Sequence, residues 1–251
     1  MIEIVALTGI PEVLPGDDLA AILADAVAAA GVVPMARDVL VVTQKIVSKA
    51  EGRFVSLAAV RPGAEAERIA DATGKDARLV ELVLDESAAV VRTAPNLLIT
   101  RHRTGHVMAN AGIDRSNLGS GEGDRALLLP EDSDASAERL RAGLARRWPA
   151  PPAIVISDSF GRPWRMGVVN VAIGASGLPA LIDRRGERDR DGRLLEVTQV
   201  AFADMVASAA GLATGEGAEG VPAALVRGLD WSAPDAPASA LVRPVEEDLF
   251  R

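Results

Sequence analysis

The sequence predicts an α+β fold, with mixed helices and strands, in two intimately joined lobes. Two kinds of apolar pattern alternate along its 251 residues. Short runs rich in β-branched residues are typical of buried strands, and longer segments with apolar residues at helical spacing are typical of amphipathic helices. Hydrophobic residues make up 49% of the chain, which is enough for a buried core at this length. We therefore expect a single domain over residues 1–251, with 149–152 as the candidate lobe boundary.

The first predicted elements are a strand, a helix and a second strand. A strand-like pattern begins at Met1. Residues 17–31 carry apolar side chains at helical spacing, with Asp17 or Asp18 as the N-cap and Gly31 as the C-cap. Residues 39–42 are continuously apolar and mostly β-branched, which predicts a strand buried on both faces.

The remaining segments continue this mixture. Helical spacing predicts helices over residues 64–73, 79–87, 135–148 and 198–212. Short apolar runs predict strands over residues 97–100, 153–156 and 168–173. Residues 230–251 are rich in Pro, Ala and Asp and show little periodicity, so we expect a tail or arm packed on the surface.

Charge and composition exclude several classes of function. The chain has 27 Lys and Arg against 35 Asp and Glu, a net charge of -8, so no overall positive field exists to bind nucleic acid or an anionic membrane. Aromatic residues total 3%, too few for a base-stacking platform. Without cysteine there is no thiolate nucleophile and no cysteine-ligated metal. With no signal-peptide pattern, we expect a cytoplasmic protein with no membrane partner.

Two familiar patterns in the sequence lack the context they require. Residues 215–220 match G-x-G-x-x-G, but they follow a predicted helix, whereas a dinucleotide turn follows a strand and opens a helix. We predict a loop at a helix end there. His102 and His106 are four apart, as in a helical metal site, but Gly105 and the preceding strand argue against a helix. We expect a surface or substrate-facing role for both.

One cluster of polar residues follows the predicted strand at 39–42. It contains Gln44, Lys45, Ser48 and Lys49. In α/β proteins, ligands bind where such strands end, and an ammonium there can neutralise phosphate oxygens. Solvated surface lysines are the alternative interpretation.

A second and a third cluster supply carboxylates. Asp114 and Asn117 lie three apart among small residues, although a plain turn explains that pattern as well. Asp158 stands next to a hydroxyl residue, and Arg162 and Arg165 follow it. Carboxylate and hydroxyl oxygens suit Mg²⁺ or Mn²⁺, and arginines suit a carboxylate or phosphate substrate.

Six segments in this order and spacing resemble the F420 gamma-glutamyl ligase family, the coenzyme F420-0:L-glutamate ligases. They include Ala-Asn-Ala-Gly-Ile-Asp-Arg-Ser-Asn at 109–117 and Ser-Asp-Ser-Phe-Gly-Arg-Pro-Trp-Arg at 157–165. The other four lie at residues 7–18, 42–53, 170–174 and 198–212. The likeness covers nearly the whole chain and resembles the stand-alone form of the ligase, without the flavin-binding domain fused to some relatives.

The resemblance implies an activity. The enzyme would join L-glutamate to F420-0, and then gamma-linked glutamate to F420-1, through an acyl phosphate, with GTP converted to GDP and phosphate. It would need Mg²⁺ or Mn²⁺, two ions per site, with K⁺ as a further ion. The family also implies a homodimer. The apolar Leu241, Val242, Leu249 and Phe250 of the expected tail support that expectation, because they need a surface to cover them.

The resemblance also implies roles for individual residues. Four neighbours would line the nucleotide together with Gln44; they are Ile10, Pro11, Glu12 and Val13. Lys49 would contact the phosphates and take part in catalysis, and Asn117 would touch GTP.

The implied metal ligands come from three places in the sequence. Asp114 and Asp158 would be catalytic metal ligands, and Ser159 would contact a second ion. Gln199, at the start of the predicted helix 198–212, is a further candidate for that ion or for the nucleotide. The arginines at 162 and 165 would bind substrate.

Two other functions remain open at this stage. One is a non-catalytic module that binds a phosphorylated ligand, which would use the lysines and arginines but need no paired aspartates. The other is a ligase of the same fold that acts on a different acid.

Overall fold

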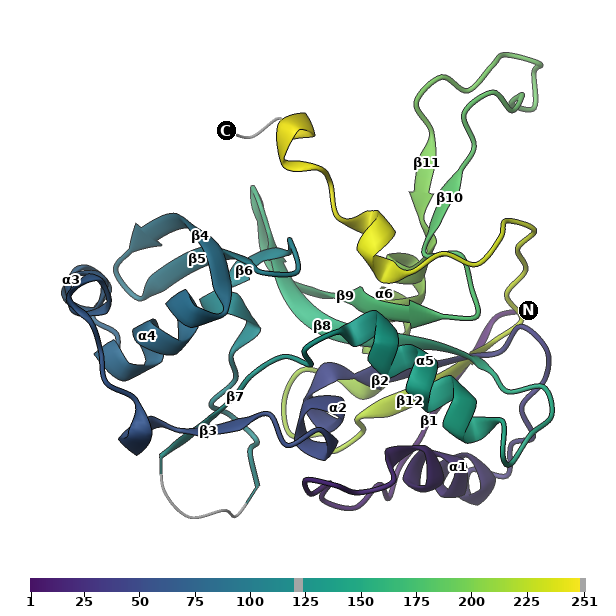
Figure 1. Ribbon diagram of the computed structural model, residues 1–251. Helices are drawn as coiled ribbons and strands as arrows, with labels where there is room; N and C mark the ends of the chain where they lie inside the picture. Colours follow the sequence, from purple (N-terminus) through teal and green to yellow (C-terminus); the bar gives the residue numbers. More distant parts are fainter. Residues whose placement is uncertain (120–123, 249–251) are drawn as a thin grey trace.

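A five-stranded sheet forms the centre of the computed structural model, which describes residues 1–119 and 124–248 (Figure 1). In spatial order its strands are β1 (Glu3–Ala6), β12 (Ala223–Arg227), β2 (Val39–Thr43), β8 (Ala153–Arg162) and β9 (Arg165–Ser176). Only β2 and β8 run parallel; every other neighbouring pair is antiparallel. Helices α1 (Leu19–Ala29) and α5 (Ser133–Leu144) cover one face, and α6 (Phe202–Thr214) covers the other.

The apolar run of β2 is explained by these two helical layers. Leu40 and Val42 point into the core beneath α1 and α5, whereas Val39 and Val41 point into the core beneath α6. A strand with both faces covered must be apolar at every position, since successive side chains alternate between the faces. The prediction for residues 39–42 is therefore confirmed.

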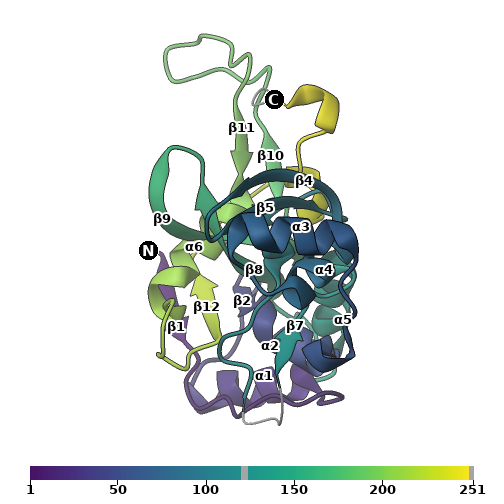
Figure 2. The same cartoon turned by 90° about the vertical axis from the view of Figure 1, so that its left-hand side faces the viewer.

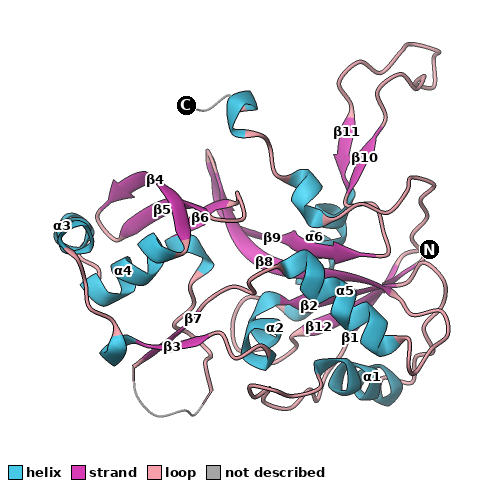
Figure 3. Ribbon diagram, viewed as in Figure 1, coloured by secondary structure: helices cyan, strands magenta, loops and turns pink. Residues whose placement is uncertain are grey.

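A smaller lobe packs beside the sheet with a core of its own (Figure 2). Its helices are α3 (Ala64–Thr73) and α4 (Ala77–Asp85), and its short helical turns are η1 (Leu57–Ala59) and η2 (Asn110–Gly112). Its strands form the sheet β4 (Ser87–Ala94), β5 (Leu97–His102), β6 (Val107–Ala109) and the pair β3 (Phe54–Ser56), β7 (Arg125–Leu127). The α+β class predicted from the sequence is confirmed (Figure 3).

An ion-pair network stands where this lobe meets the sheet. Glu86, at the end of α4, accepts hydrogen bonds from Arg103 Nε at 3.2 Å, Arg53 Nη2 at 3.4 Å and His102 Nε2 at 3.4 Å. The His102 hydrogen bond, with help from the two arginines and against the effect of burial, lowers the pKa of Glu86 to about 2. Because His102 is fully buried here, the expectation of a surface role for it was wrong.

Tertiary pairing changes the boundaries of two predicted elements. The predicted helix 198–212 begins as strand β11 (Gln199–Ala201), which pairs with β10 (Leu181–Asp183), and the helix itself starts at Phe202. Strand β8 does not end at residue 156 but continues to Arg162, because β9 pairs with it along that length. Both differences depend on a partner strand that local spacing does not reveal.

The C-terminal arm packs on its own chain. The Asp134 carboxylate accepts hydrogen bonds from the backbone N–H groups of Ala238 at 2.7 Å and Ser239 at 3.1 Å. Leu241 packs against the core beneath α6, Val242 is half-buried, and the arm contains the turns η3 (Ala238–Leu241) and η4 (Val245–Glu247). Leu249 and Phe250 lie outside the described residues.

Residues 149–152, the candidate lobe boundary of the sequence analysis, lie in the segment that joins α5 to β8.

The helices of the described residues are too short or too polar for any of them to cross a membrane.

Candidate active site

Helix α2 (Gln44–Ala50) begins directly after β2 and presents the first polar cluster on one face. On a helix of 3.6 residues per turn, Gln44 lies next to Ser48 and Lys45 lies next to Lys49, so the four side chains share one side of α2. Gln44 is 3% exposed, Lys49 is 4% exposed and Ser48 is fully buried. The alternative of solvated surface lysines is therefore wrong for Lys49.

The smaller lobe contributes Asp114 to this face of α2. Its Oδ2 accepts a hydrogen bond from Gln44 Nε2 at 2.8 Å and lies 3.5 Å from Lys45 Nζ. Ser48 Oγ donates to Gln44 Oε1 at 2.9 Å, which turns the amide so that its NH₂ group faces Asp114. Burial raises the pKa of Asp114, while Lys45 and Gln44 lower it.

A tight turn determines the direction from which Asp114 enters the site. Asn110, Ala111 and Gly112 all have positive φ, between 50° and 71°. A Cβ on Gly112 would stand 2.7 Å from Leu129 Cδ1 and 2.8 Å from Met108 Sδ. The small residues of this segment thus permit close packing between the lobes.

Asp158 lies on β8, just past a bulge at Ile156 and Ser157. Burial is the largest cause that raises its pKa, to about 7, and the negative charges of Asp114 and Glu216 raise it further. The backbone N–H of Ser159, 2.9 Å from Oδ1, and the charge of Lys45 act in the opposite direction. We expected Asp158 at a strand end, and the structure places it inside the longer strand, near Asp114.

Glu216 is a site residue that the sequence analysis missed. Its Oε2 accepts from Ser159 Oγ at 2.6 Å, and its Oε1 accepts from Asn170 Nδ2 at 2.8 Å. It belongs to the G-x-G-x-x-G segment, which follows α6 as predicted and leads into β12. The available signal was an acidic residue between two glycines in a loop that returns to the central sheet.

The same loop contacts the smaller lobe. Asn117 Nδ2 donates to the carbonyl oxygen of Gly217 at 3.5 Å. Lys45 Nζ donates to the carbonyl oxygen of Ser116 at 3.3 Å, one residue earlier. The structure thus brings residues from both lobes together around Asp114 and Asp158.

Lys49 and the segment before α1 meet beside this group. Lys49 Nζ donates to Glu12 Oε1 at 2.6 Å. Ile10 is partly buried against the core, Pro11 is exposed, and Val13 is a core residue that is 2% exposed. Of the four residues predicted here to line a nucleotide, only Glu12 contacts a polar side chain of the α2 face.

Three other predicted site residues lie apart from this group. Gln199 is exposed on β11, where its side chain hydrogen-bonds Asp183 and helps to lower the pKa of that carboxyl. Arg162 and Arg165 flank the turn of the β8–β9 hairpin, and Arg162 Nη2 donates to the carbonyl oxygen of Met166 at 3.0 Å. Gln199 begins a strand, not the helix that the sequence predicted.

The donor set around Asp158 fits a hard divalent cation. The carboxylates of Asp114 and Glu216 both act on Asp158, and Lys45 is the cation that opposes them there. A divalent cation would offset this excess negative charge. Across residues 1–119 and 124–248, no three His, Asp or Glu side chains are arranged to hold one ion. Mg²⁺, which uses one or two carboxylates and completes its shell with water and phosphate oxygens, matches such a site.

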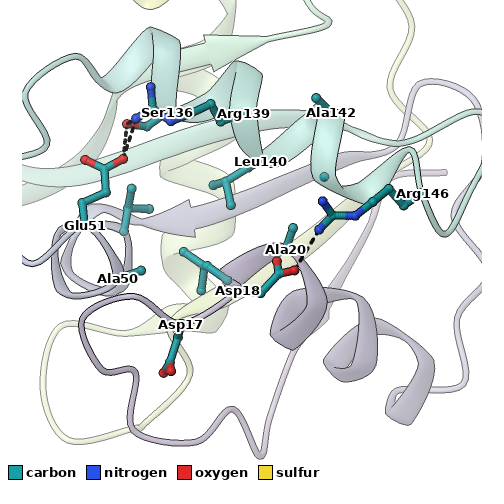
Figure 4. Close-up of a pocket in the computed structure, with 13 residues that line it drawn as sticks. Asp17, Asp18, Ala20, Ala50, Glu51, Ser136, Arg139, Leu140, Ala142 and Arg146 are labelled. Atoms are coloured by element: carbon teal, nitrogen blue, oxygen red, sulfur yellow. Dashed lines mark hydrogen bonds and ion pairs between the residues drawn. The ribbon is translucent and has the colours of Figure 1, made fainter.

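A cavity of about 480 Å³ lies elsewhere, between α1, α5 and the end of α2 (Figure 4). Most of its charged side chains pair with one another: Glu51 Oε1 accepts from Arg139 Nη2 as well as from Ser136 Oγ, and Asp18 accepts from Arg146. None of the predicted site residues lines it. We therefore assign the chemistry to the carboxylate group between the lobes.

Comparisons with known proteins show the family of the chain. The model of the family described as F420-0:Gamma-glutamyl ligase matches residues 9–228. The coenzyme F420:L-glutamate ligase of Methanothermobacter thermautotrophicus is 43% identical, with 100% of this chain and 99% of the relative covered. The proteins of the same name from Methanopyrus kandleri and Natronomonas pharaonis are 44% and 46% identical over 96% and 99% of this chain, and 94% of each relative is covered.

The family match and the full-length relatives show an enzyme of the ligase class. Within that class, the chain belongs to the F420-0:gamma-glutamyl ligase family.

Proposed function

We propose that this enzyme joins L-glutamate to coenzyme F420-0, and gamma-linked glutamate to F420-1, with hydrolysis of GTP to GDP and phosphate. The names of the full-length relatives support the acid and the amino acid. The observation that carries the proposal is the partly buried pair Asp114 and Asp158, which comes from both lobes and has too little positive charge around it. Two such carboxylates can bind the metal ion of a polyphosphate, whereas they contribute little to the stability of the fold.

Asp114 and Asp158 would hold Mg²⁺ or Mn²⁺. The Ser159 hydroxyl and Glu216 would serve a second ion, in preference to Gln199, which hydrogen-bonds Asp183. The metal supplies positive charge that stabilises the phosphates in the transition state. K⁺ remains a prediction with no donor set assigned to it.

The chain's own residues position the reactants. Gln44, held by Ser48, fixes the Asp114 carboxylate, and Lys49 and Asn117 would contact the nucleotide. The exposed Arg165 and the half-buried Arg162 would bind the acidic substrate. Catalysis in this arrangement depends mainly on orientation and electrostatics.

The proposed chemistry has two steps. A carboxylate oxygen of the acceptor acid attacks the γ-phosphorus of GTP, and GDP leaves. The amine of L-glutamate then attacks the carbonyl carbon of the acyl phosphate, phosphate leaves, and the amine loses a proton. The contacts described for the site include no cysteine or histidine, so activation falls on the substrate rather than on an enzyme nucleophile.

Mass spectrometry of the product after incubation with F420-0, GTP, Mn²⁺ and L-glutamate tests this function. We expect F420-0 to gain one glutamate and then a second, with matching GDP release. Product from a different acid but none from F420-0 would favour a ligase for another substrate. Nucleotide binding without product from any acid would favour the binding module.

An isotope experiment tests the acyl phosphate. With oxygen-18 in the terminal carboxylate of F420-0, one labelled oxygen should appear in the released phosphate, because the amine displaces that oxygen together with phosphorus. Productive ligation without label in phosphate would exclude this route even if the substrate assignment is right.

We also propose a cytoplasmic homodimer, as the family resemblance implies. Because Leu241 is covered by its own chain, the arm supports this less than the sequence suggested. Analytical ultracentrifugation at micromolar concentration should show a dimer, and a monomer at every concentration would exclude it.

A further inference from the structure

The ion pair between Lys49 and Glu12 is unequal in its exposure. The Lys49 side chain is 6% exposed, whereas the Glu12 side chain is 52% exposed, and their charged atoms are 2.6 Å apart. A buried ammonium that loses its partner is strongly destabilised, whereas a half-exposed carboxylate can be released into water at little cost. The lysine therefore stays where it is, and the glutamate is the partner that can leave.

Lys49 is well placed for a phosphate of a ligand at the carboxylate site. It lies one helical turn beyond Lys45 on α2, about 6 Å along the helix axis, and Lys45 is 3.5 Å from Asp114. A polyphosphate bound near Asp114 could span that separation.

The other side of Glu12 is bounded by Gly119. A Cβ at position 119 would stand 2.5 Å from Glu12 Oε1 and 3.1 Å from its Cδ, and Gly119 has a φ of +82°. The missing side chain leaves a space between the backbone and Lys49 that is filled by the carboxylate. An anionic oxygen of a ligand can bind the same ammonium, since carboxylate and phosphate oxygens make equivalent charge-assisted hydrogen bonds.

We propose that Glu12 is a positioning residue that holds the Lys49 ammonium in place and yields it to a nucleotide phosphate. Glu12 then competes with the nucleotide from within the protein, so it weakens the binding of any ligand whose phosphate reaches Lys49. The inference rests on the proposed function, because it requires a nucleotide at this site.

Calorimetric titration with GMP-PNP and Mg²⁺ tests the proposal. We expect Glu12→Gln to bind GMP-PNP roughly three- to tenfold more tightly than the wild type, because the competing charge is gone. Glu12→Asp keeps the charge and should stay near the wild-type affinity. Guanosine, which has no phosphate, should bind all three proteins equally. Glu51→Gln removes another glutamate ion pair, with Arg139 at 2.8 Å, and should leave GMP-PNP affinity unchanged.

The outcomes separate this inference from the proposed function. If the wild type binds GMP-PNP and Glu12→Gln binds it no more tightly, the competing role is wrong and the nucleotide site stands. If Glu12→Gln also tightens guanosine binding, Glu12 acts on the nucleoside and the inference is overturned. If the wild type binds neither compound, the nucleotide assignment fails, and the inference fails with it.

Discussion

Glu86 and Asp158 are both shielded carboxylates near the line where the lobes meet, but their surroundings have opposite signs. Glu86 faces Arg53, Arg103 and His102, and its pKa falls to about 2. Asp158 faces two other carboxylates and one lysine, and its pKa rises to about 7. Burial raises the pKa of both, so the difference comes from the partners.

This difference separates a group that holds the lobes together from one that, as we propose, serves a ligand. Side chains of the protein itself neutralise the Glu86 carboxylate, so the negative charge of Glu86 stabilises the fold. Around Asp158 the protein supplies too little positive charge, so the Asp158 carboxylate is suited to bind a cation from solution. Four variants and one added cation test this comparison.

The largest effect is expected from Asp114→Asn and Asp158→Asn. Each should lower turnover by about a thousandfold or more, because the metal and phosphate charges lose a carboxylate. Stability at pH 8 should be equal to or greater than that of the wild type, since a repulsive charge is removed. Ligation assays and urea unfolding measure the two quantities. Asp71→Asn, an exposed position on α3, is the control and should change neither. Near-normal turnover in both site variants would reject the metal assignment.

Glu86→Gln should act in the opposite way. The pKa of Glu86 lies at about 2, below its ordinary value of 4.5, so its charge stabilises the folded state fully above pH 4.5. That stabilisation is lost as the pH falls from 4.5 towards 2. At pH 7 the variant should lose about 2 to 3 kcal/mol of unfolding free energy. Between pH 4.5 and 2, its unfolding free energy should fall less steeply with decreasing pH than that of the wild type.

The measurement for Glu86 is urea unfolding between pH 3 and 7. Glu65→Gln removes an exposed pair, with Arg68 at 3.6 Å, and should change stability by less than about 0.5 kcal/mol. An equal loss of unfolding free energy in both variants would show that the network at the lobe junction stabilises the fold no more than an exposed ion pair does.

Added Mn²⁺ should raise the melting temperature by roughly 5 °C at pH 8 when it is well above its Kd. The effect should be smaller at pH 5.5. The raised pKa of Asp158 means that the metal-free fold loses stability as the pH rises from 3.8 to about 7, and a bound cation restores it. EDTA should reverse the gain, and Asp158→Asn should abolish it. A shift that is the same at both pH values would argue against binding at Asp158.

The smallest effect is expected from Ser48→Ala. The variant frees the Gln44 amide to rotate, so Asp114 loses a fixed hydrogen-bond donor, and kcat/KM should fall about three- to tenfold. Unfolding free energy should fall by about 1 kcal/mol. Ser56→Ala, at an exposed position on β3, serves as the matched control.

Much of the fold could be predicted because the pattern of the sequence is strong where an element is buried on both faces, as at 39–42, or along one helical stripe, as at 64–73. The run at 39–42 and the helix at 64–73 formed as predicted. Polar residues that directly follow an apolar strand, such as Gln44 and Lys49, were also visible in the sequence. Asp114 and Asp158 were visible in the same way, the family resemblance added their expected roles as metal ligands, and the structure brought their charges together.

Tertiary structure decided what depends on partners far along the chain. Gln199 has helical neighbours in the sequence but joins a strand, because residues 181–183 pair with it. The sequence around Glu216 offers only a weak signal, an acidic residue between two glycines, and Glu216 joins the site because α6 and β12 bring its loop against Ser159. His102 looks like a surface residue in the sequence but is buried, and its Nε2 donates a hydrogen bond to Glu86. The sequence by itself determined which residues carry charge and which segments are apolar enough to form the buried helices and strands. The packing of the two lobes determined which of those charges are neutralised, because Coulomb interactions depend on distances in space that no local pattern encodes.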